Sequence, residues 1–120
     1  MHSAPKNNLL IAEDDPAVLT ALEGFFLDSG YEVRTATDGF EALAKINDSV
    51  PDILLSDLNM PRMSGFDLLA LVSRQFPNVR LIAMSGATGP GMTYGVAAHS
   101  VYQKGSGSGD LLSAVESLRP

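Results

Sequence analysis

The chain has 120 residues, of which 45% are hydrophobic and 18% are charged, and it has no cysteine. This length predicts one domain with a substantial core, and the composition excludes an intrinsically disordered chain. The lack of cysteine excludes a disulfide framework and fits a reducing, cytoplasmic location. A net charge of −6 with scattered basic residues argues against direct nucleic-acid binding. No apolar run is long enough to cross a membrane.

Short apolar runs alternate with segments of helical period along the chain. Residues 8–13 predict a buried strand, and 14–30 predict a helix with Asp15 as its N-cap, Pro16 in its first turn and Gly30 as its stop. The apolar stripe of this helix is expected to consist of Val18, Leu22, Phe25 and Phe26.

The next two strand and helix pairs follow the same pattern. Residues 31–36 predict a strand, and 37–48 predict a helix capped by Asp38. Residues 52–57 predict a third strand, and 64–76 predict a third helix. The core-facing residues of this third helix are expected to include Phe66, Leu69 and Val72.

The pattern weakens after the fourth strand, which is predicted over 79–84. Residues 85–100 contain four glycines and one proline, so the fourth of five helices is expected to be short or irregular, over 92–98. A fifth strand is predicted over 100–104 and a last helix over 109–119. One face of this last helix carries Leu111, Leu112, Val115 and Leu118.

Five strands that alternate with helices predict an α/β fold. Right-handed crossovers then give a parallel sheet with helices on both faces. In such doubly wound sheets, polar chemistry gathers beyond the carboxyl ends of the strands. We therefore expect one domain over 8–120, preceded by a flexible N-terminal segment over 1–7.

Acidic residues follow two of the predicted strands at this edge of the sheet. Glu13, Asp14 and Asp15 follow the first strand, and Asp57 ends the third. Asp15 is explained by its role as a helix cap, which leaves three further carboxylates on one rim. Crowded carboxylates repel one another unless a cation compensates. Mg²⁺ is a hard ion that binds one or two carboxylates and keeps waters that a phosphate can replace, so it fits this rim.

A hydroxyl and an ammonium are expected on the same rim. Ser85 follows the fourth strand, and Lys104 ends the fifth. Both groups stabilise an anion, and a phosphoryl group on Asp57 would contact the metal ion, the hydroxyl and the ammonium. Asp57 would then be a covalent nucleophile that forms an acyl phosphate.

The chain resembles the receiver domains of two-component response regulators, the CheY-like family of the bacterial chemotaxis regulator. The resemblance covers about residues 8–118 and implies a flavodoxin-like five-stranded sheet of order 2-1-3-4-5. The segment "SDLNMPRMSG" is the most specific match. The matching segments, in the family's order, are "LLIAEDDPAVL", "TDGFEAL", "DILLSDLNMPRMSGFDLL", "LIAMSGA" and "YQKG".

The resemblance implies roles for individual residues. Asp57 matches the phosphoryl-accepting aspartate and Asp14 the direct metal ligand. Glu13 matches an acid that acts through a metal-bound water, and Asn59 a residue whose backbone carbonyl completes the metal site.

Three further positions match the family's phosphoryl-binding residues. Ser85 matches the switch hydroxyl, Gly86 the small residue beside the phosphoryl group, and Lys104 the strand-five lysine. The resemblance implies a signalling switch rather than an enzyme, with Mg²⁺ as its cofactor. Its expected partners are a sensor histidine kinase or phosphotransfer protein and an unidentified downstream protein, with the chain a monomer or weak dimer.

The chain departs from the family at two places. Lys104 is followed by Gly105, where the family commonly has a proline, and the interval from Ser85 to Lys104 is shorter by about one helical turn. Val101 stands at the family's aromatic switch position, and the neighbouring Tyr102 is expected to pack at the sheet edge.

Two other functions are compatible with this fold. One is a pseudo-receiver, an interaction module that signals without phosphate. The other is a phosphatase similar to the haloacid dehalogenases, although Asn59 stands where those enzymes have a second aspartate. The glycine-rich segment 85–91 could also cradle a phosphate, but no P-loop lysine follows it. The sequence leaves open whether the chain is a standalone regulator or the receiver of a longer protein.

Overall fold

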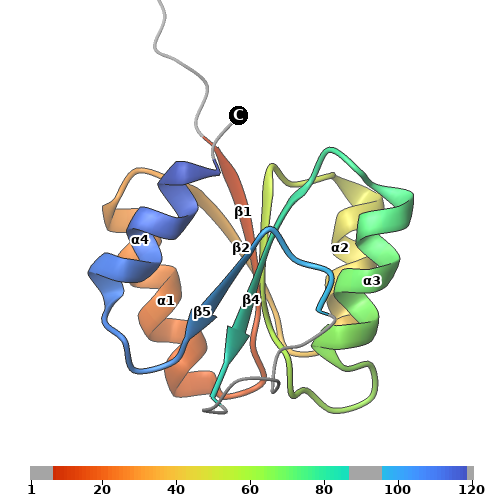
Figure 1. Ribbon diagram of the computed structural model, residues 1–120, viewed down its shortest axis with the longest axis horizontal. Coiled ribbons are helices and arrows are strands. Elements are labelled where there is room, and N and C mark those ends of the chain that lie inside the picture. The colour runs from red at the N-terminus through yellow and green to blue at the C-terminus, as the bar shows by residue number, and fades with distance from the viewer. Residues whose placement is uncertain (1–6, 87–95, 119–120) are drawn as a thin grey trace, which may run out of the picture.

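The structure, a computed structural model, describes residues 7–86 and 96–118. Within these residues the chain forms a parallel sheet of five strands in the order β2-β1-β3-β4-β5, with helices on both faces (Figure 1). The predicted doubly wound α/β fold and its strand order are confirmed. The elements are β1 (Asn8–Ala12), α1 (Pro16–Asp28), β2 (Glu32–Ala36), α2 (Gly39–Asp48), β3 (Ile53–Asp57), α3 (Gly65–Gln75), β4 (Arg80–Ser85), β5 (Ser100–Gln103) and α4 (Ser108–Ser117).

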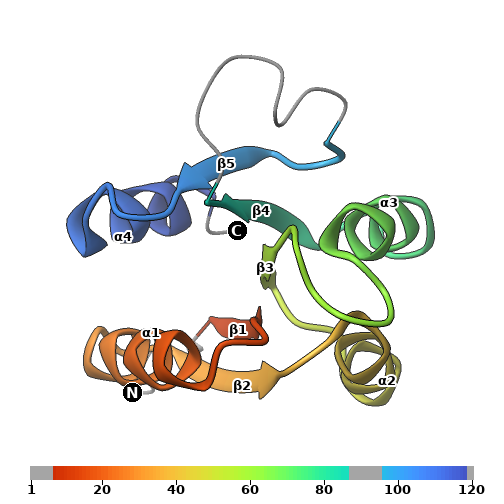
Figure 2. The same cartoon turned by 90° about the horizontal axis from the view of Figure 1, so that it is seen from below.

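The sheet separates two hydrophobic cores. Helices α1 and α4 cover one face, and α2 and α3 cover the other (Figure 2). Leu9 and Ile11 of β1 face α1 and α4, whereas Leu10 and Ala12 face α2 and α3. The inner strands therefore carry continuous apolar runs, such as Leu9–Ala12 and Ile53–Leu55, rather than an alternating pattern, because a parallel sheet is buried on both faces.

The predicted starts of the first two helices are confirmed. The Asp15 side chain accepts a hydrogen bond from the backbone N–H of Ala17 at 3.0 Å, and Pro16 occupies the first position of α1. The Asp38 side chain accepts from the N–H of Glu41 at 2.8 Å and so caps α2. Each cap satisfies a donor that the helix itself leaves without a partner.

Two predicted core positions are wrong. Phe66 is 39% exposed, and Leu68 is buried in its place. The buried stripe of α3 begins at Gly65 and continues through Leu68, and Phe66 lies outside this stripe. In α1, Val18 and Leu19 are both half-buried, but Leu19 and not Val18 packs against the core. In both helices the apolar stripe has the expected period but starts at a different residue.

The last helix agrees with its prediction. Residues Leu111 and Val115 of α4 are fully buried, and Leu112 and Leu118 pack against the same core. The short helix predicted over 92–98 lies mostly outside the described residues, and 96–98 form neither helix nor strand.

His99 fixes the start of the edge strand β5. Its backbone N–H donates to the Leu81 carbonyl at 2.8 Å, and its ring Nδ1 accepts from the Leu81 N–H at 2.9 Å. His99 therefore satisfies the backbone N–H and carbonyl of Leu81 in β4 just before the pairing of β4 with β5 begins.

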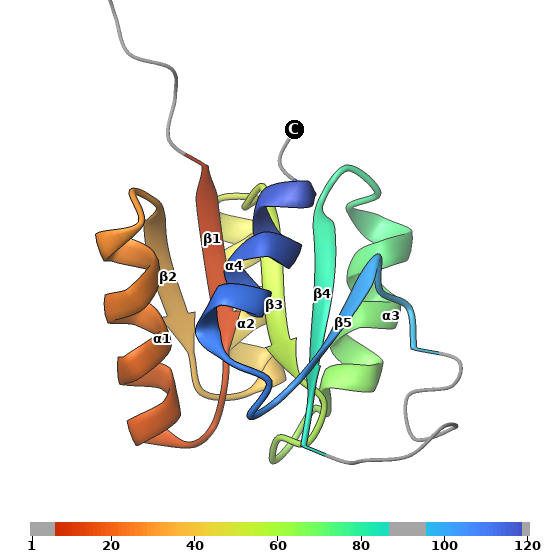
Figure 3. The same cartoon turned by 60° about the vertical axis from the view of Figure 1, so that its left-hand side comes forward.

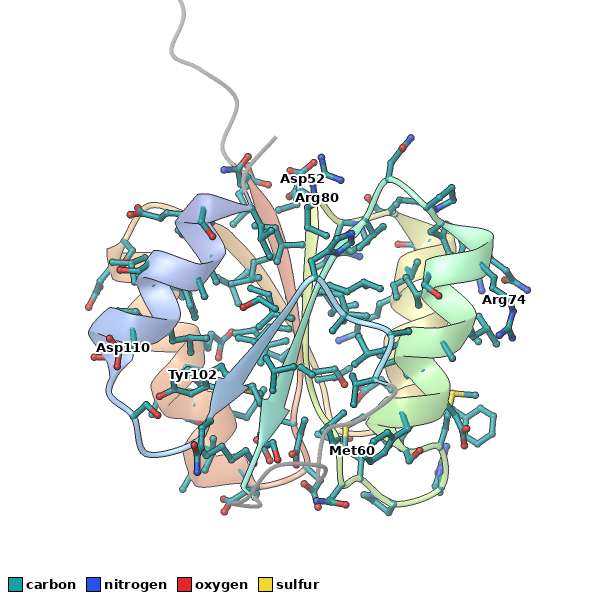
Figure 4. The ribbon with its side chains drawn as sticks, in the orientation of Figure 1. Asp52, Met60, Arg74, Arg80, Tyr102 and Asp110 are labelled. Carbon is teal, nitrogen blue, oxygen red and sulfur yellow. The ribbon has the colours of Figure 1, made fainter. Side chains whose placement is uncertain are left out.

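All five strands run in one direction, so their carboxyl ends meet at a single edge of the sheet (Figure 3). Asp52 and Arg80 lie at the opposite edge, and Met60 lies near the carboxyl edge (Figure 4). None of the helices in the described part of the chain has the length and apolar character of a membrane span.

Candidate functional site

Three carboxylates meet at the carboxyl edge of the sheet. Glu13 and Asp14 follow β1, and Asp57 is the last residue of β3. One carboxylate oxygen from each of the three lies within 4.8 Å of the others. Glu13 and Asp57 are buried, whereas Asp14 is exposed. Strands β1 and β3 are neighbours in the sheet, and for that reason two segments more than forty residues apart in the sequence converge here.

Lys104, the residue that follows β5, joins this acidic cluster. Its ammonium Nζ lies 2.8 Å from Glu13 Oε1 and 3.3 Å from Asp57 Oδ1. Its backbone N–H donates to the Ser85 carbonyl at 2.8 Å, which continues the pairing of β5 with β4 beyond the last strand residue. The lysine thereby supplies the positive charge that two buried carboxylates require.

Two groups of the cluster, Glu13 and Lys104, have shifted pKa values. Burial raises the pKa of Glu13 above its usual range, and the negative charge of Asp57 adds to this, against the lowering effect of Lys104 and of the Asp15 N–H. Burial alone would lower the pKa of Lys104, but the carboxylates of Glu13 and Asp57 outweigh it and raise that pKa. At neutral pH the lysine therefore remains a cation between two acids.

The backbone of Asp57 is tightly packed. The Ser56 hydroxyl donates to the Asp57 carbonyl at 2.9 Å, and the N–H of Leu58 donates to the Met84 carbonyl at 3.1 Å. A β-carbon at Gly65 would lie 1.9 Å from the Asp57 carbonyl oxygen, so only glycine fits there. No sequence pattern indicates this contact between Gly65 and Asp57.

Ser85 and Gly86 lie beside Lys104 at the end of β4. Ser85 is buried and is the last residue of that strand, one position beyond Met84, which pairs with Asp57. A β-carbon at Gly86 would have Lys104 Cδ as its nearest neighbour, at 3.9 Å. The backbone of Gly86 is therefore uncrowded on the side that faces Lys104.

The loop between β3 and α3 carries Asn59, which is exposed. Its role as a carbonyl ligand stays a prediction. The same loop contains Arg62, whose φ of 69° lies in the left-handed region. The Arg62 Nε lies 3.4 Å from Asp38 Oδ2, and its guanidinium lies 5.7 Å from the centre of the Phe40 ring. Arg62 was missed from the sequence because neither the strained backbone nor the contact with α2 has a local sequence signal.

The donor atoms at this edge fit a hard divalent cation. All three clustered side chains offer carboxylate oxygens. Glu13 Oε1 is fully buried, and although Lys104 lies close to it, the contact lacks the angular geometry of a hydrogen bond. Glu13 Oε2 accepts from the Asp15 N–H at 3.1 Å, which fixes the orientation of this carboxylate. The carboxylate oxygens of Glu13, Asp14 and Asp57 are therefore of the kind, and close enough together, to hold a hard cation.

Comparison with known proteins identifies the family. Residues 9–116 match the response regulator receiver domain. Protein PilG of Pseudomonas aeruginosa is 34% identical over 83 residues, which are 68% of this chain and 62% of PilG. The DNA-binding transcriptional regulator NtrC of Proteus hauseri is 32% identical over 80 residues, which are 67% of this chain and 17% of NtrC. The chain thus spans less than two thirds of the lengths of these relatives.

A solved structure agrees with this match over nearly the whole chain. The chemotaxis response regulator CheY4 of Vibrio cholerae has a TM-score of 0.88 and 28% sequence identity, covering 95% of this chain and 99% of that one. The family match and the structural match therefore agree. The acidic cluster of this chain lies at the carboxyl edge of the sheet. The chain therefore belongs to the response regulator receiver domains.

Proposed function

We propose that the chain is a phosphorylation-dependent signalling receiver whose phosphoryl acceptor is Asp57. The observation that carries this proposal is the position of Asp57, a buried carboxylate within the acidic cluster and 3.3 Å from the Lys104 ammonium. A nucleophilic carboxylate needs nearby cations, because charge builds up on the transferred phosphoryl oxygens. The proposed donor is a phosphohistidine of a sensor histidine kinase or phosphotransfer protein.

In the proposed reaction, an oxygen of Asp57 forms a bond to phosphorus while the bond between phosphorus and the donor's imidazole nitrogen breaks. The electron pair of the broken bond remains on the imidazole, which takes up a proton from water. The product is an acyl phosphate on Asp57. Lys104 pairs with an oxygen of that phosphoryl group, and the hydroxyl of Ser85, at the end of the neighbouring strand, donates to another.

Mg²⁺ is the proposed cofactor, and it supplies charge neutralisation when bound. Asp14 and Asp57 would hold it directly, Glu13 would act through a bound water, and Asn59 would contribute its backbone carbonyl. The clustering of the three carboxylates supports this assignment. Lys104 already pairs with Glu13 and Asp57, so part of the charge is balanced before a metal ion binds.

The phosphoryl group is proposed to act as a switch for a downstream protein. It would draw Ser85 and Lys104 toward Asp57 and so bias the ends of β4 and β5 toward one of two conformations. The receiver unit is assigned to residues 8–120, after an N-terminal segment of residues 1–7. We place this signalling domain in the cytoplasm. We expect it to be a monomer or weak dimer that makes no direct contact with nucleic acid.

The experiment is phosphorylation by a small donor. The protein is mixed with Mg²⁺ and phosphoramidate, and the covalent phosphate is measured by intact-protein mass spectrometry. We expect one alkali-labile phosphoryl group in the wild type and none in Asp57→Asn. The control, Asp110→Asn, changes an exposed acid in the first turn of α4 and should be phosphorylated normally. Absence of phosphate on the wild type would refute the proposal.

A phosphate-independent interaction module is the second candidate. It is favoured by the turn after Lys104, where Gly105 and Gly107 have φ of 92° and 108° and no proline is present. Such a turn constrains the lysine less than a proline would. Mg²⁺ titration separates the two candidates, because an interaction module needs no affinity in the millimolar range. A phosphatase is disfavoured because Asn59 cannot act as a general acid.

A further inference from the structure

The turn that carries Lys104 is held at only a few points. The Lys104 N–H donates to the Ser85 carbonyl at 2.8 Å, and the Ser106 N–H donates to the Gln103 carbonyl at 3.1 Å. Gly105 and Gly107 both have positive φ. Proline has φ near −65°, so it cannot occupy position 105 in this conformation, and the turn needs another means of restraint.

Tyr102 closes this turn with its side chain. Its hydroxyl donates to the Gly107 carbonyl at 3.1 Å, five residues farther along the chain. Gly107 is the N-cap residue of α4 and offers no side-chain cap. The ring of Tyr102 packs on the core beneath α1 and α4, as predicted for a residue at the sheet edge (Figure 4). The ring is therefore an anchor, and the hydroxyl ties the far end of the turn to β5.

Lys104 lies between the two ends of this tether. Its long side chain is 29% exposed and reaches both Glu13 and Asp57. A lysine side chain has many rotamers, so the position of its backbone decides how often the ammonium occupies one place. Among the contacts described for the turn, the Tyr102 hydroxyl is the side-chain group that holds the segment after Lys104.

We propose that Tyr102 is a positioning residue for Lys104 in the phosphorylation of Asp57. This inference rests on the proposed function. The hydroxyl, rather than the ring, performs this role by restraining the turn from Lys104 to Gly107. Tyr102 therefore supplies, by a hydrogen bond across the turn, a restraint that a proline at position 105 cannot supply in this conformation.

The test compares Tyr102→Phe, which keeps the ring, with Tyr31→Phe, which removes the same atom before β2 at the opposite edge of the sheet. Phosphorylation by phosphoramidate with Mg²⁺ is timed by intact-protein mass spectrometry. We expect the rate constant to fall about fivefold in Tyr102→Phe, the effect of losing one hydrogen bond, and to be unchanged in Tyr31→Phe.

A second measurement detects the position of Lys104 directly. The chain has three lysines, so NMR of isotope-labelled lysine side chains resolves Lys104, assigned by a Lys104→Met variant. We expect the order of the Lys104 side chain to fall in Tyr102→Phe and to remain unchanged in Tyr31→Phe. A loss of thermal stability with unchanged Lys104 order and an unchanged rate would overturn the inference. Failure of the wild type to become phosphorylated would instead overturn the proposed function, and the NMR result would still report the tether.

Discussion

The backbones of Gly65 and Asp57 are in direct contact. Gly65 is the first residue of α3, and Asp57 is the last residue of β3. A β-carbon at Gly65 would lie 1.9 Å from the Asp57 carbonyl oxygen and 2.7 Å from Leu58 Cα. Both neighbours are backbone atoms and cannot rotate away. The N–H of Gly65 also donates to the Leu58 carbonyl at 3.0 Å, so the loop closes on the residues beside the nucleophile.

Gly65→Ala is therefore expected to displace the backbone of Asp57. We expect the free energy of unfolding to fall by about 3 kcal/mol, at the upper end for overpacking, with loss of phosphorylation. Urea denaturation measures the first effect. The matched control is Gly24→Ala in α1, where a β-carbon has no atom within 4 Å. That change should raise the free energy of unfolding by about 0.5–1 kcal/mol, because alanine favours the helix. Equal stability of Gly65→Ala and wild type would contradict the contact.

Mg²⁺ is expected to stabilise the folded chain. A ligand at ten times its dissociation constant adds about 1.4 kcal/mol to the free energy of unfolding when only the folded state binds it. Asp14→Asn should abolish most of this increment, because the exposed Asp14 is the carboxylate in the cluster most open to an incoming ion. Denaturant titrations with and without Mg²⁺ measure it. Asp110→Asn is the control and should retain the full Mg²⁺-dependent increment. If both variants lost the same share of this increment, the acidic cluster would not be the Mg²⁺ site.

Position 62 is expected to tolerate asparagine, a turn-forming residue, better than a β-branched residue such as valine. Its φ of 69° disfavours any side chain, and a β-branched one most of all. Arg62→Asn should remain within about 0.5 kcal/mol of wild type, since the relief of strain offsets an ion pair that is 65% exposed on the arginine side. Arg62→Val should lower the free energy of unfolding by about 1–2 kcal/mol. If the two variants proved equally stable, the left-handed conformation would not be a constraint.

The lowered pKa of Glu41 is expected to make part of the free energy of unfolding depend on pH. The Thr37 N–H holds its pKa below the usual value of 4.5, with help from the Thr37 hydroxyl and Lys45. A lowered folded-state pKa contributes stability above the unfolded pKa, and this is lost as pH falls through the folded pKa. Glu41→Gln should therefore cost about 0.5 kcal/mol at pH 7, a small value because the side chain is 42% exposed.

The difference between wild type and Glu41→Gln should vanish in acid, where the glutamic acid is as neutral as glutamine. Thermal unfolding from pH 7 down to pH 3 follows this convergence. Glu116→Gln, at an exposed acid of α4, should parallel wild type throughout. A difference between wild type and Glu41→Gln that stayed constant with pH would assign the effect to helix propensity instead of charge.

The elements and their order were predictable because each has a local physical cause. Asp15 before Pro16 favours a helix start, and the apolar run Ile53–Leu55 is typical of a strand buried on both faces. Phe66 was misplaced because helical spacing defines a stripe but not its starting residue, which the packing of Gly65 against Asp57 decides.

The sequence by itself determined which residues reach the carboxyl edge, since a parallel sheet gathers the ends of its strands. Only the tertiary structure decided that Lys104 pairs with both Glu13 and Asp57. It also decided that the Tyr102 hydroxyl reaches Gly107. The Lys104 contacts join residues far apart in the chain, and the bond to Gly107 depends on the φ of each glycine in an unusual turn. Strand alternation and helical period carry no information about either, because each describes one segment and not the distance between two.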